Sequence, residues 1–452
     1  MIPRHPARSS ARIVRRAGAA ATALLVLAQV APAEGQDDPR LVAAVDSIFS
    51  ALRDPEAPGC AAGGYRDGRL VVGRGYGSAD LERQTAISTA TLFNVGSVSK
   101  QFTALAVLLL VEEGSLSLDA DLRELLPELE NIPAGITVRH LLHHTSGLRD
   151  PFGALLVSGW RSHDVITIGD LVAAAARQRT LNFPVGADFQ YNTGAFALLA
   201  EIVARRSGIP FGEFSRTRIF EPLGMSRTVV LEHHQQVIPG RALGYSRIGA
   251  SRWGLDVAQS DFGGATGVHT SIEDLARWVS NLENPVVGRP ETIALLRTPA
   301  KLADGTTGAY GMGLFPARFK GRQVESHGGS DGGYRSFFVH APGERVAAAV
   351  LCNAPGPNPD VLAHQVLEIL LGRDATGASA AAAPRAAGDG QGGAVPASYW
   401  SEELERVITI RSTADRVELL GSGRPLSFVA TGSGKFVTAG ESPDTLVFPA
   451  GK

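Results

Sequence analysis

A serine and a lysine stand three residues apart in NVGSVSKQFTALAVLLLVEEG, residues 94–114, and this spacing suits covalent catalysis. Residues three apart on a helix share one face, so the Lys100 amine can reach the Ser97 hydroxyl. Only five of the 43 lysines and arginines are lysines, so position 100 holds the rarer basic residue. Lysine can lose its proton when buried, and a serine needs such a base to become a nucleophile. The pair predicts a serine nucleophile activated by an uncharged amine.

The apolar residues after Lys100 predict a buried helix that begins near Ser97. A helix start carries partial positive charge, which helps a lysine to lose its proton and stabilises a developing oxyanion. S-x-x-K is a weak signal on its own, although this is its only occurrence in the chain.

The surrounding elements must hold this segment in place. Residues 37–54 predict an amphipathic helix, and residues 59–77 predict a hairpin around Asp67-Gly68. Residues 100–283 are mostly helical in pattern, residues 323–356 predict antiparallel strands, and residues 361–372 predict a last helix. Because a lone hairpin is marginally stable, we expect the early and late strands to form one sheet. The predicted fold is α/β: an antiparallel sheet flanked by terminal helices, with an inserted all-helical subdomain and a cleft at their boundary.

The two ends of the chain differ from this middle. Residues 1–33 carry five arginines, no acid and an apolar run that ends in Ala31-Pro32-Ala33, which predicts a signal peptide and a periplasmic or secreted protein. The alternative, an uncleaved membrane anchor, is disfavoured because the run is short and Gln29 interrupts it. We expect one large domain over residues 36–373, a linker over 374–397, and a small accessory β domain over 398–452. Because the last domain stops directly after a strand pattern, we expect it to be incomplete.

Charge and cysteine content limit the partners. Removal of the five leader arginines takes the formal net charge from −2 to −7, which argues against nucleic acid and anionic membranes. We expect no cofactor, no metal, and no integral membrane span once the signal is cleaved. Cys60 and Cys352 could form one disulfide in an oxidising compartment or remain two small buried residues.

Two further patterns suggest other chemistry. GGSDG, residues 328–332, fits the nucleophile elbow G-x-S-x-G, but an elbow needs a following helix, and YRSFFVH predicts a strand. The histidines at positions 140, 143 and 144 have a spacing that could hold a metal, but no acidic or cysteine ligand is close in sequence. A structural role for these histidines is favoured.

The segment LFNVGSVSKQFTA resembles the nucleophile segment of serine β-lactamases and penicillin-binding proteins, especially their class C and D-stereospecific peptidase branch. TVRHLLHHTSGL, IFEPLGM, GGATGVHTSIEDLARW and ESHGGSDGGYRSFF are similar to further family segments in the same order. The resemblance covers most of residues 40–372.

The resemblance implies roles for further residues. In DFQYNTGAFALLAEIV, Tyr191 would shuttle protons, while Thr193 stands where the family has asparagine and would offer a substrate amide one hydroxyl. The backbone N–H groups of Ser97 and Ser330 would form the oxyanion hole. His327-Gly328-Gly329 replaces the usual Lys-Thr-Gly. The glycines would let a substrate backbone approach, and His327 would be a weak, pH-dependent anchor for a substrate carboxylate.

The resemblance therefore implies an exported serine hydrolase that forms an acyl-enzyme on Ser97. Its substrate would be a small molecule or peptide: a D-amino-acyl peptide, an ester or a β-lactam, with peptidase or esterase activity favoured over efficient β-lactamase activity. One alternative is a non-catalytic, penicillin-binding-like module, motivated by Thr193. Another places the function in the C-terminal unit, as a wall-binding domain.

Overall fold

The computed structural model describes residues 38–372 except 162, 250 and 251, and the backbone of six C-terminal strands. The predicted signal peptide (1–33) and linker (374–397) lie outside the described residues.

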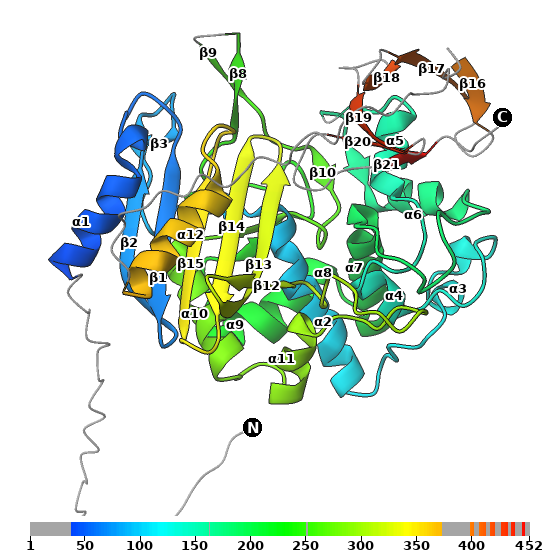
Figure 1. Ribbon diagram of the computed structural model, residues 1–452, viewed down its shortest axis with the longest axis horizontal. Helices are drawn as coiled ribbons and strands as arrows, with labels where there is room; N and C mark the ends of the chain where they lie inside the picture. The colour runs from blue at the N-terminus through cyan, green and yellow to red at the C-terminus, as the bar shows by residue number, and fades with distance from the viewer. Residues whose placement is uncertain are drawn as a thin grey trace, which may run out of the picture. The chain divides into compact units, whose positions relative to one another are not determined.

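A six-stranded antiparallel sheet forms the centre of the fold, in the order β12-β13-β14-β15-β1-β2 (Figure 1). The hairpin β1–β2 turns at Asp67 and Gly68, whose φ angles of 50° and 70° are typical of a tight hairpin. β1 pairs on its other side with β15, so the early hairpin and late strands form one sheet, as predicted. The strands are β1 (Cys60–Arg66), β2 (Arg69–Tyr76), β12 (Phe315–Phe319), β13 (Arg322–Asp331), β14 (Tyr334–Ala341) and β15 (Val346–Cys352).

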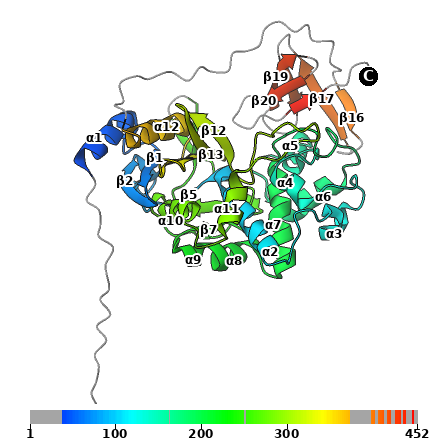
Figure 2. The same ribbon diagram turned by 60° about the horizontal axis from the view of Figure 1, so that its bottom comes forward.

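Helices cover both faces of the sheet. The terminal helices α1 (Pro39–Ile48) and α12 (Pro359–Leu370) pack on one face, and α10 (Ile272–Glu283) packs on the other (Figure 2). Side chains of β15 alternate between two hydrophobic cores: Val350 packs with the terminal helices, and Leu351 packs with the helical block. β15 is buried along its whole length because both faces are covered.

The inserted block is mainly helical, and α2 (Lys100–Glu112) runs through it. α2 is buried on nearly all sides because α7, α8 and α11 pack around it, which explains its almost uniformly apolar sequence. The other α-helices are α3 (Leu122–Leu125), α4 (Val138–Leu142), α5 (Pro151–Val157), α6 (Ile168–Ala176), α7 (Thr193–Ser207), α8 (Phe211–Ser215), α9 (Glu221–Leu223) and α11 (Pro290–Arg297). Short strands connect them: β3 (Ser78–Asp80), β4 (Thr85–Ala86), β5 (Phe93–Asn94), β6 (Ile166–Thr167), β7 (Val229–Val230), β8 (Tyr245–Ile248), β9 (Arg252–Leu255), β10 (Ser260–Asp261) and β11 (Val268–Thr270).

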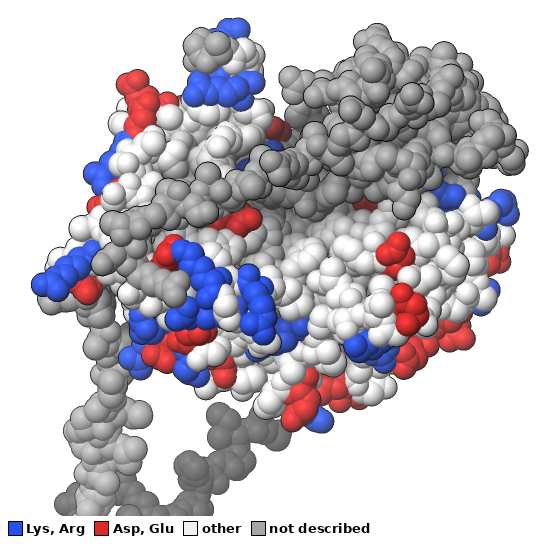
Figure 3. All heavy atoms as spheres, in the orientation of Figure 1, with Lys and Arg blue, Asp and Glu red and all other residues white. Residues whose placement is uncertain are grey.

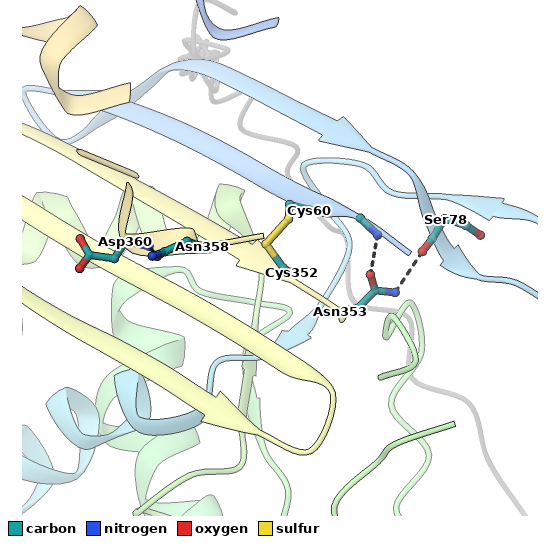
Figure 4. Close-up of a disulfide and its surroundings, with 7 residues drawn as sticks. Cys60, Ser78, Cys352, Asn353, Asn358 and Asp360 are labelled. Carbon is teal, nitrogen blue, oxygen red and sulfur yellow. Dashed lines mark hydrogen bonds between the residues drawn. A yellow bond between two sulfur atoms is a disulfide. The ribbon is translucent and has the colours of Figure 1, made fainter. Parts of the chain in front are cut away.

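Cys60 and Cys352 form a disulfide across the β1–β15 pair (Figure 4). They are direct partners in the antiparallel register, and their Cα atoms lie 4.0 Å apart. The next residue, Asn353, accepts a hydrogen bond from the Gly59 N–H (2.8 Å) and donates one to the Ser78 carbonyl (3.0 Å). The structure thus decides between the two alternatives for the cysteines.

The described C-terminal strands form a six-stranded antiparallel meander. Its strands pair in sequence order: β16 (Ser398–Ser401), β17 (Arg406–Ser412), β18 (Arg416–Leu420), β19 (Leu426–Gly432), β20 (Lys435–Thr438) and β21 (Thr445–Val447).

The charged surface is mixed. On the face shown in Figure 3, basic side chains are interspersed with acidic ones. Among the described residues, every helix is too short or too polar to span a bilayer. The expectation that nucleic acid is not a partner stays a prediction.

Candidate active site

The nucleophile segment lies on a sharp turn between β5 and α2. Ser97 lies in a 3-10 turn, Gly96–Ser99, and the α-helix starts at Lys100, slightly later than predicted. Gly96 has a φ of +50°, and a Cβ there would lie 2.5 Å from the Ser330 nitrogen. Asn94 accepts the Gly96 N–H at 2.9 Å and holds the turn in place. Glycine is therefore required where the nucleophile turn meets β13.

Lys100 is fully buried, and its amine contacts the nucleophile. Nζ lies 2.9 Å from the Ser97 Oγ and 2.8 Å from the Ala265 carbonyl oxygen. Burial lowers the Lys100 pKa to about 7, although the charges of Asp150 and Asp331 act to raise it. A large fraction of the amine is therefore uncharged near neutral pH. With one N–H donated to Ala265, its lone pair can point at the Ser97 hydroxyl.

Tyr191 lies beside this pair. Its ring centroid is 5.0 Å from Lys100 Nζ, and its hydroxyl is buried without a hydrogen bond of normal geometry in the described part of the chain. Burial raises the Tyr191 pKa, while the Ser97 hydroxyl acts to lower it and the Asp150 charge acts to raise it. Tyr191 is therefore a neutral phenol near pH 7, suited to donate a proton.

β13 brings the third predicted segment to the nucleophile. A Cβ on Gly329 would lie 2.1 Å from the Val95 carbonyl oxygen, so only glycine allows the strand to approach the nucleophile turn this closely. Ser336 on β14 donates a hydrogen bond to the same carbonyl at 2.7 Å. The backbone of Ser330 consequently lies against Gly96, the residue before Ser97, and the oxyanion hole of the Ser97 and Ser330 N–H groups stays a prediction.

His327 is held as a neutral imidazole, whereas the family resemblance implied a pH-dependent anchor for a substrate carboxylate. Its Nδ1 donates to the Gly328 carbonyl (2.6 Å), and its Nε2 accepts the Tyr310 hydroxyl (2.9 Å). Burial, together with the Lys100 charge, lowers the His327 pKa to about 3. Both nitrogens are engaged and the ring is uncharged at neutral pH, so it offers a substrate carboxylate no positive charge.

Comparison with known proteins agrees with this geometry. Residues 45–372 match the Beta-lactamase family, and this match covers most of the chain. The chain belongs to the Beta-lactamase family. The prediction of the family is thereby confirmed.

Curated relatives of this Beta-lactamase family chain include D-aminopeptidases. That of Gluconobacter oxydans (strain 621H) is 31% identical over 333 residues, which are 74% of this chain and 62% of the relative. That of Brucella anthropi is 28% identical over 325 residues, 70% of this chain and 60% of the relative. The chain thus spans about three-fifths of the length of these relatives.

Solved structures share the fold. The octameric penicillin-binding protein homologue from Pyrococcus abyssi matches with a TM-score of 0.64 and 24% identity, over 91% of this chain and 95% of the other. D-amino acid amidase from Ochrobactrum anthropi SV3 matches with a TM-score of 0.60 and 22% identity, over 74% of this chain and 99% of the other.

The second segment of this Beta-lactamase family site departs from the usual pattern as the sequence indicated. Asn192 is buried and caps α7: it accepts the Ala195 N–H at 2.8 Å and donates to the Leu148 carbonyl at 2.9 Å. The side-chain oxygen and nitrogen of Asn192 are therefore both used in structural hydrogen bonds. Thr193 is the first residue of α7, and its N–H donates to Asp150 at 3.2 Å. Its role toward substrate stays a prediction.

Two carboxyl groups near Lys100 were not identified from the sequence. Asp150 accepts the backbone N–H groups of Phe152 (3.1 Å) and Gly194 (2.8 Å), so it links the starts of α5 and α7. Asp331 accepts a hydrogen bond from Asn94 at 2.8 Å. Burial raises the pKa of each, and the Lys100 charge acts to lower both. Asp150 lies two residues after the segment TVRHLLHHTSGL and Asp331 lies within ESHGGSDGGYRSFF, but only the tertiary structure places them near the amine.

The two other sequence patterns have structural explanations. Ser330 lies on β13, and the chain continues into β14, so the helix that a nucleophile elbow requires is replaced by a strand. Each of the three clustered histidines has its own backbone partner. The Nδ1 atoms of these histidines pair with the Thr137 N–H (His140), the Tyr310 carbonyl (His143) and the Asn192 N–H (His144).

Proposed function

We propose that this protein is an exported serine hydrolase that cleaves amide bonds of D-amino-acid amides and of peptides with a free amino-terminal D-residue. The observation that carries the proposal is the 2.9 Å contact between the Ser97 hydroxyl and a buried Lys100 amine whose pKa is about 7. Such an amine is a base at neutral pH, matched to the task of taking a serine proton.

Acylation follows from this arrangement. Ser97 Oγ attacks the substrate carbonyl carbon, its proton passes to Lys100 Nζ, and the carbonyl oxygen becomes an oxyanion. The backbone N–H groups of Ser97 and Ser330 stabilise that oxyanion, and each such donor contributes about 2.7 to 4 kcal/mol in the transition state. Ala265 then accepts a hydrogen bond from the protonated amine.

Breakdown of the intermediate requires a proton on the leaving amine. Tyr191 is a neutral phenol beside Lys100, so it donates its proton to the leaving nitrogen and regains one from the Lys100 ammonium. The C–N bond breaks and leaves an ester on Ser97. Water then attacks this ester while the same groups take up its proton; the bond between the acyl carbon and Ser97 Oγ breaks, that proton returns to Oγ, and the acid product leaves.

The neutral His327 supports the choice of substrate. Substrates recognised through a carboxylate beside the scissile bond, such as C-terminal dipeptides and β-lactams, need a cation that His327 does not supply. Substrates with a free amine do not need it, and curated relatives at about 30% identity are D-aminopeptidases. Simple esters rank next, since their leaving group demands less protonation, and β-lactams rank last.

Export is supported by the disulfide. A bond between Cys60 and Cys352 forms and persists in oxidising compartments and is rare in the cytosol. We infer that residues 1–33 direct the chain out of the cytoplasm. Fractionation of the producing cells, with amino-terminal sequencing of the mature chain, would test this. A cytoplasmic protein that retains Met1 would refute export.

A substrate panel tests the activity. Hydrolysis of D-alanine p-nitroanilide, its L isomer, a p-nitrophenyl ester, an N-acylated D-alanyl dipeptide and a chromogenic cephalosporin is compared for wild type and Ser97→Ala. We expect the D-anilide to be cleaved fastest and Ser97→Ala to be inactive on every substrate.

Labelling separates an enzyme from a binding module. A fluorophosphonate probe followed by mass spectrometry should give one adduct, on Ser97. A folded protein without adduct and without turnover would instead support the non-catalytic module. Cleavage of the N-acylated dipeptide in preference to the D-anilide would overturn the substrate assignment and retain the mechanism.

A further inference from the structure

Three side chains away from Ser97 converge on one point of the surface. His233 and His234 lie in the turn between β7 and β8, and Asp261 ends β10. The His234 Nδ1 is 2.8 Å from one Asp261 carboxylate oxygen, and the His233 Nδ1 is 3.6 Å from the other. One potential ligand atom from each of the three residues lies within 4.8 Å of the others. This is the only such cluster found in the described part of the chain.

The fold holds the carboxylate in place. β10 pairs with β6, with Asp261 opposite Thr167, so the Asp261 backbone is fixed. Its carboxylate also accepts the backbone N–H of His234 at 2.5 Å. The side chains of Asp261 and His234 are 14% and 18% exposed, whereas that of His233 is 65% exposed. Two ligands are therefore positioned by the fold, and the third borders solvent.

We propose that His233, His234 and Asp261 bind one divalent transition-metal ion of the Zn²⁺ class. Two imidazole nitrogens and a carboxylate form a donor set that suits Zn²⁺, Co²⁺ or Ni²⁺ better than Ca²⁺ or Mg²⁺, which prefer oxygen ligands. The ion would replace the direct hydrogen bond between His234 Nδ1 and Asp261 and would use the Nδ1 atoms of both histidines. Solvent beside His233 supplies water for the remaining coordination positions.

The position of Asp261 suggests what the ion would do. The segment that follows Asp261 supports α2: the Gly264 carbonyl accepts the Thr103 hydroxyl (2.7 Å), and the Ala265 carbonyl accepts Lys100 Nζ (2.8 Å). A metal bridge between the 233–234 turn and Asp261 would restrain the start of this segment. The ion is a brace for the fold and takes no part in acyl transfer.

The test is a Zn²⁺ titration of the mature chain, made without a polyhistidine tag and followed by calorimetry. Wild type should bind one ion per chain, and both cysteines are in the disulfide, so they do not compete. His233→Ala and Asp261→Asn should each weaken binding about tenfold or more, since even residues behind the ligands change affinity by 10- to 100-fold. Co²⁺ should give visible absorption with wild type and lose intensity with either variant.

The matched control is His364→Ala. His364 and Asp360 also form a histidine–carboxylate pair, with 2.6 Å between Nδ1 and Oδ1, but without a second histidine. This variant should bind Zn²⁺ like wild type, and Zn²⁺ should raise the Tm of both but not that of His233→Ala. The proposal would be overturned if wild type showed no saturable Zn²⁺ binding, or if folded His233→Ala bound Zn²⁺ with wild-type affinity. Ser97→Ala should still bind Zn²⁺, so this result is independent of whether the proposed hydrolysis is correct.

Discussion

Lys100 in the active site and His340 in the central sheet are both completely buried basic side chains, yet their surroundings shift their pKa values in opposite directions. The two hydrogen-bond partners of the Lys100 amine, Ser97 and the Ala265 carbonyl, are uncharged, and burial lowers its pKa to about 7. At His340, burial also acts to lower the pKa, but Glu283 and Glu325 outweigh it and raise the pKa overall.

The ion pairs around His340 explain the difference. Its Nδ1 lies 2.8 Å from Glu325, and its Nε2 lies 3.5 Å from Glu283. Arg297 pairs with Glu325 (2.8 Å), and Arg345 pairs with Glu283 (2.9 Å). A buried base whose direct hydrogen-bond partners are neutral thus becomes reactive, whereas a buried base in direct contact with carboxylates becomes a fixed part of the fold.

The largest expected effect is on catalysis, from Lys100→Arg. Arginine keeps a positive charge at the site but cannot give up its proton, so the base is lost. We expect kcat/KM for the D-anilide to fall by about 10⁴-fold or more, in line with the loss of a nucleophile-activating group. Steady-state kinetics would measure this, with circular dichroism as the control for folding. A loss of less than tenfold would show that Lys100 is not the base.

The corresponding change at the other cation, His340→Leu, should affect stability instead. It leaves two buried carboxylates without their shared partner, and breaking a buried ion pair in this way costs about 3 to 5 kcal/mol. Urea denaturation should show this drop in the free energy of unfolding, while kcat/KM of the folded variant changes less than about threefold. Unchanged stability would contradict a structural role for the cluster.

Two tyrosines in the active site allow a catalytic role to be compared with a structural one. Tyr191→Phe removes the proposed proton donor and should lower kcat by about 10² to 10⁴-fold, the usual worth of general acid catalysis. Tyr310→Phe is the matched control: it leaves His327 Nε2 without its partner, which should cost about 1 to 3 kcal/mol of stability. Equal losses of kcat in the two variants would argue against proton transfer by Tyr191.

The smallest effect is the pH dependence of stability, where the two cations should differ in sign. Between pH about 7 and 10.5, unfolded Lys100 binds a proton that the folded state does not, so its burial makes the free energy of unfolding rise with pH. The stabilisation from His340 is complete below its unfolded pKa of about 6.5 and is lost as pH rises through its higher folded pKa.

Urea titrations at several pH values would test this, with Lys100→Met and His340→Leu each compared with wild type. Each full proton contributes a slope of at most about 1.4 kcal/mol per pH unit. The difference curves should have opposite slopes. Slopes of the same sign would show that one of the two pKa shifts has the wrong direction.

Much of the fold follows from local patterns. The two apolar runs joined at Asp67-Gly68 predicted the early hairpin, and the apolar residues after Lys100 predicted a buried helix. The long-range contacts do not follow from local patterns, because the residues that make them are far apart in the sequence. Cys60 and Cys352 are 292 positions apart, and only the strand register makes them partners.

Some residues of the site could likewise be predicted from the sequence, and others could not. Ser97, Lys100 and Tyr191 were identified from spacing and family resemblance, and the structure brings them together. The neutral state of His327 was not predicted, because the Tyr310 hydroxyl and the depth of burial cannot be inferred from its own segment. His233, His234 and Asp261 carried no recognisable spacing, since two adjacent histidines and a distant aspartate fit no metal motif.

The sequence by itself determined which atoms are available for chemistry and the short-range geometry between them, because the path of a helical turn puts Ser97 beside Lys100 wherever that segment folds. Only the tertiary structure decided which of these groups carry protons. The proton affinity of Lys100, His327 and His340 depends on the water excluded and the charges brought near by segments far away along the chain.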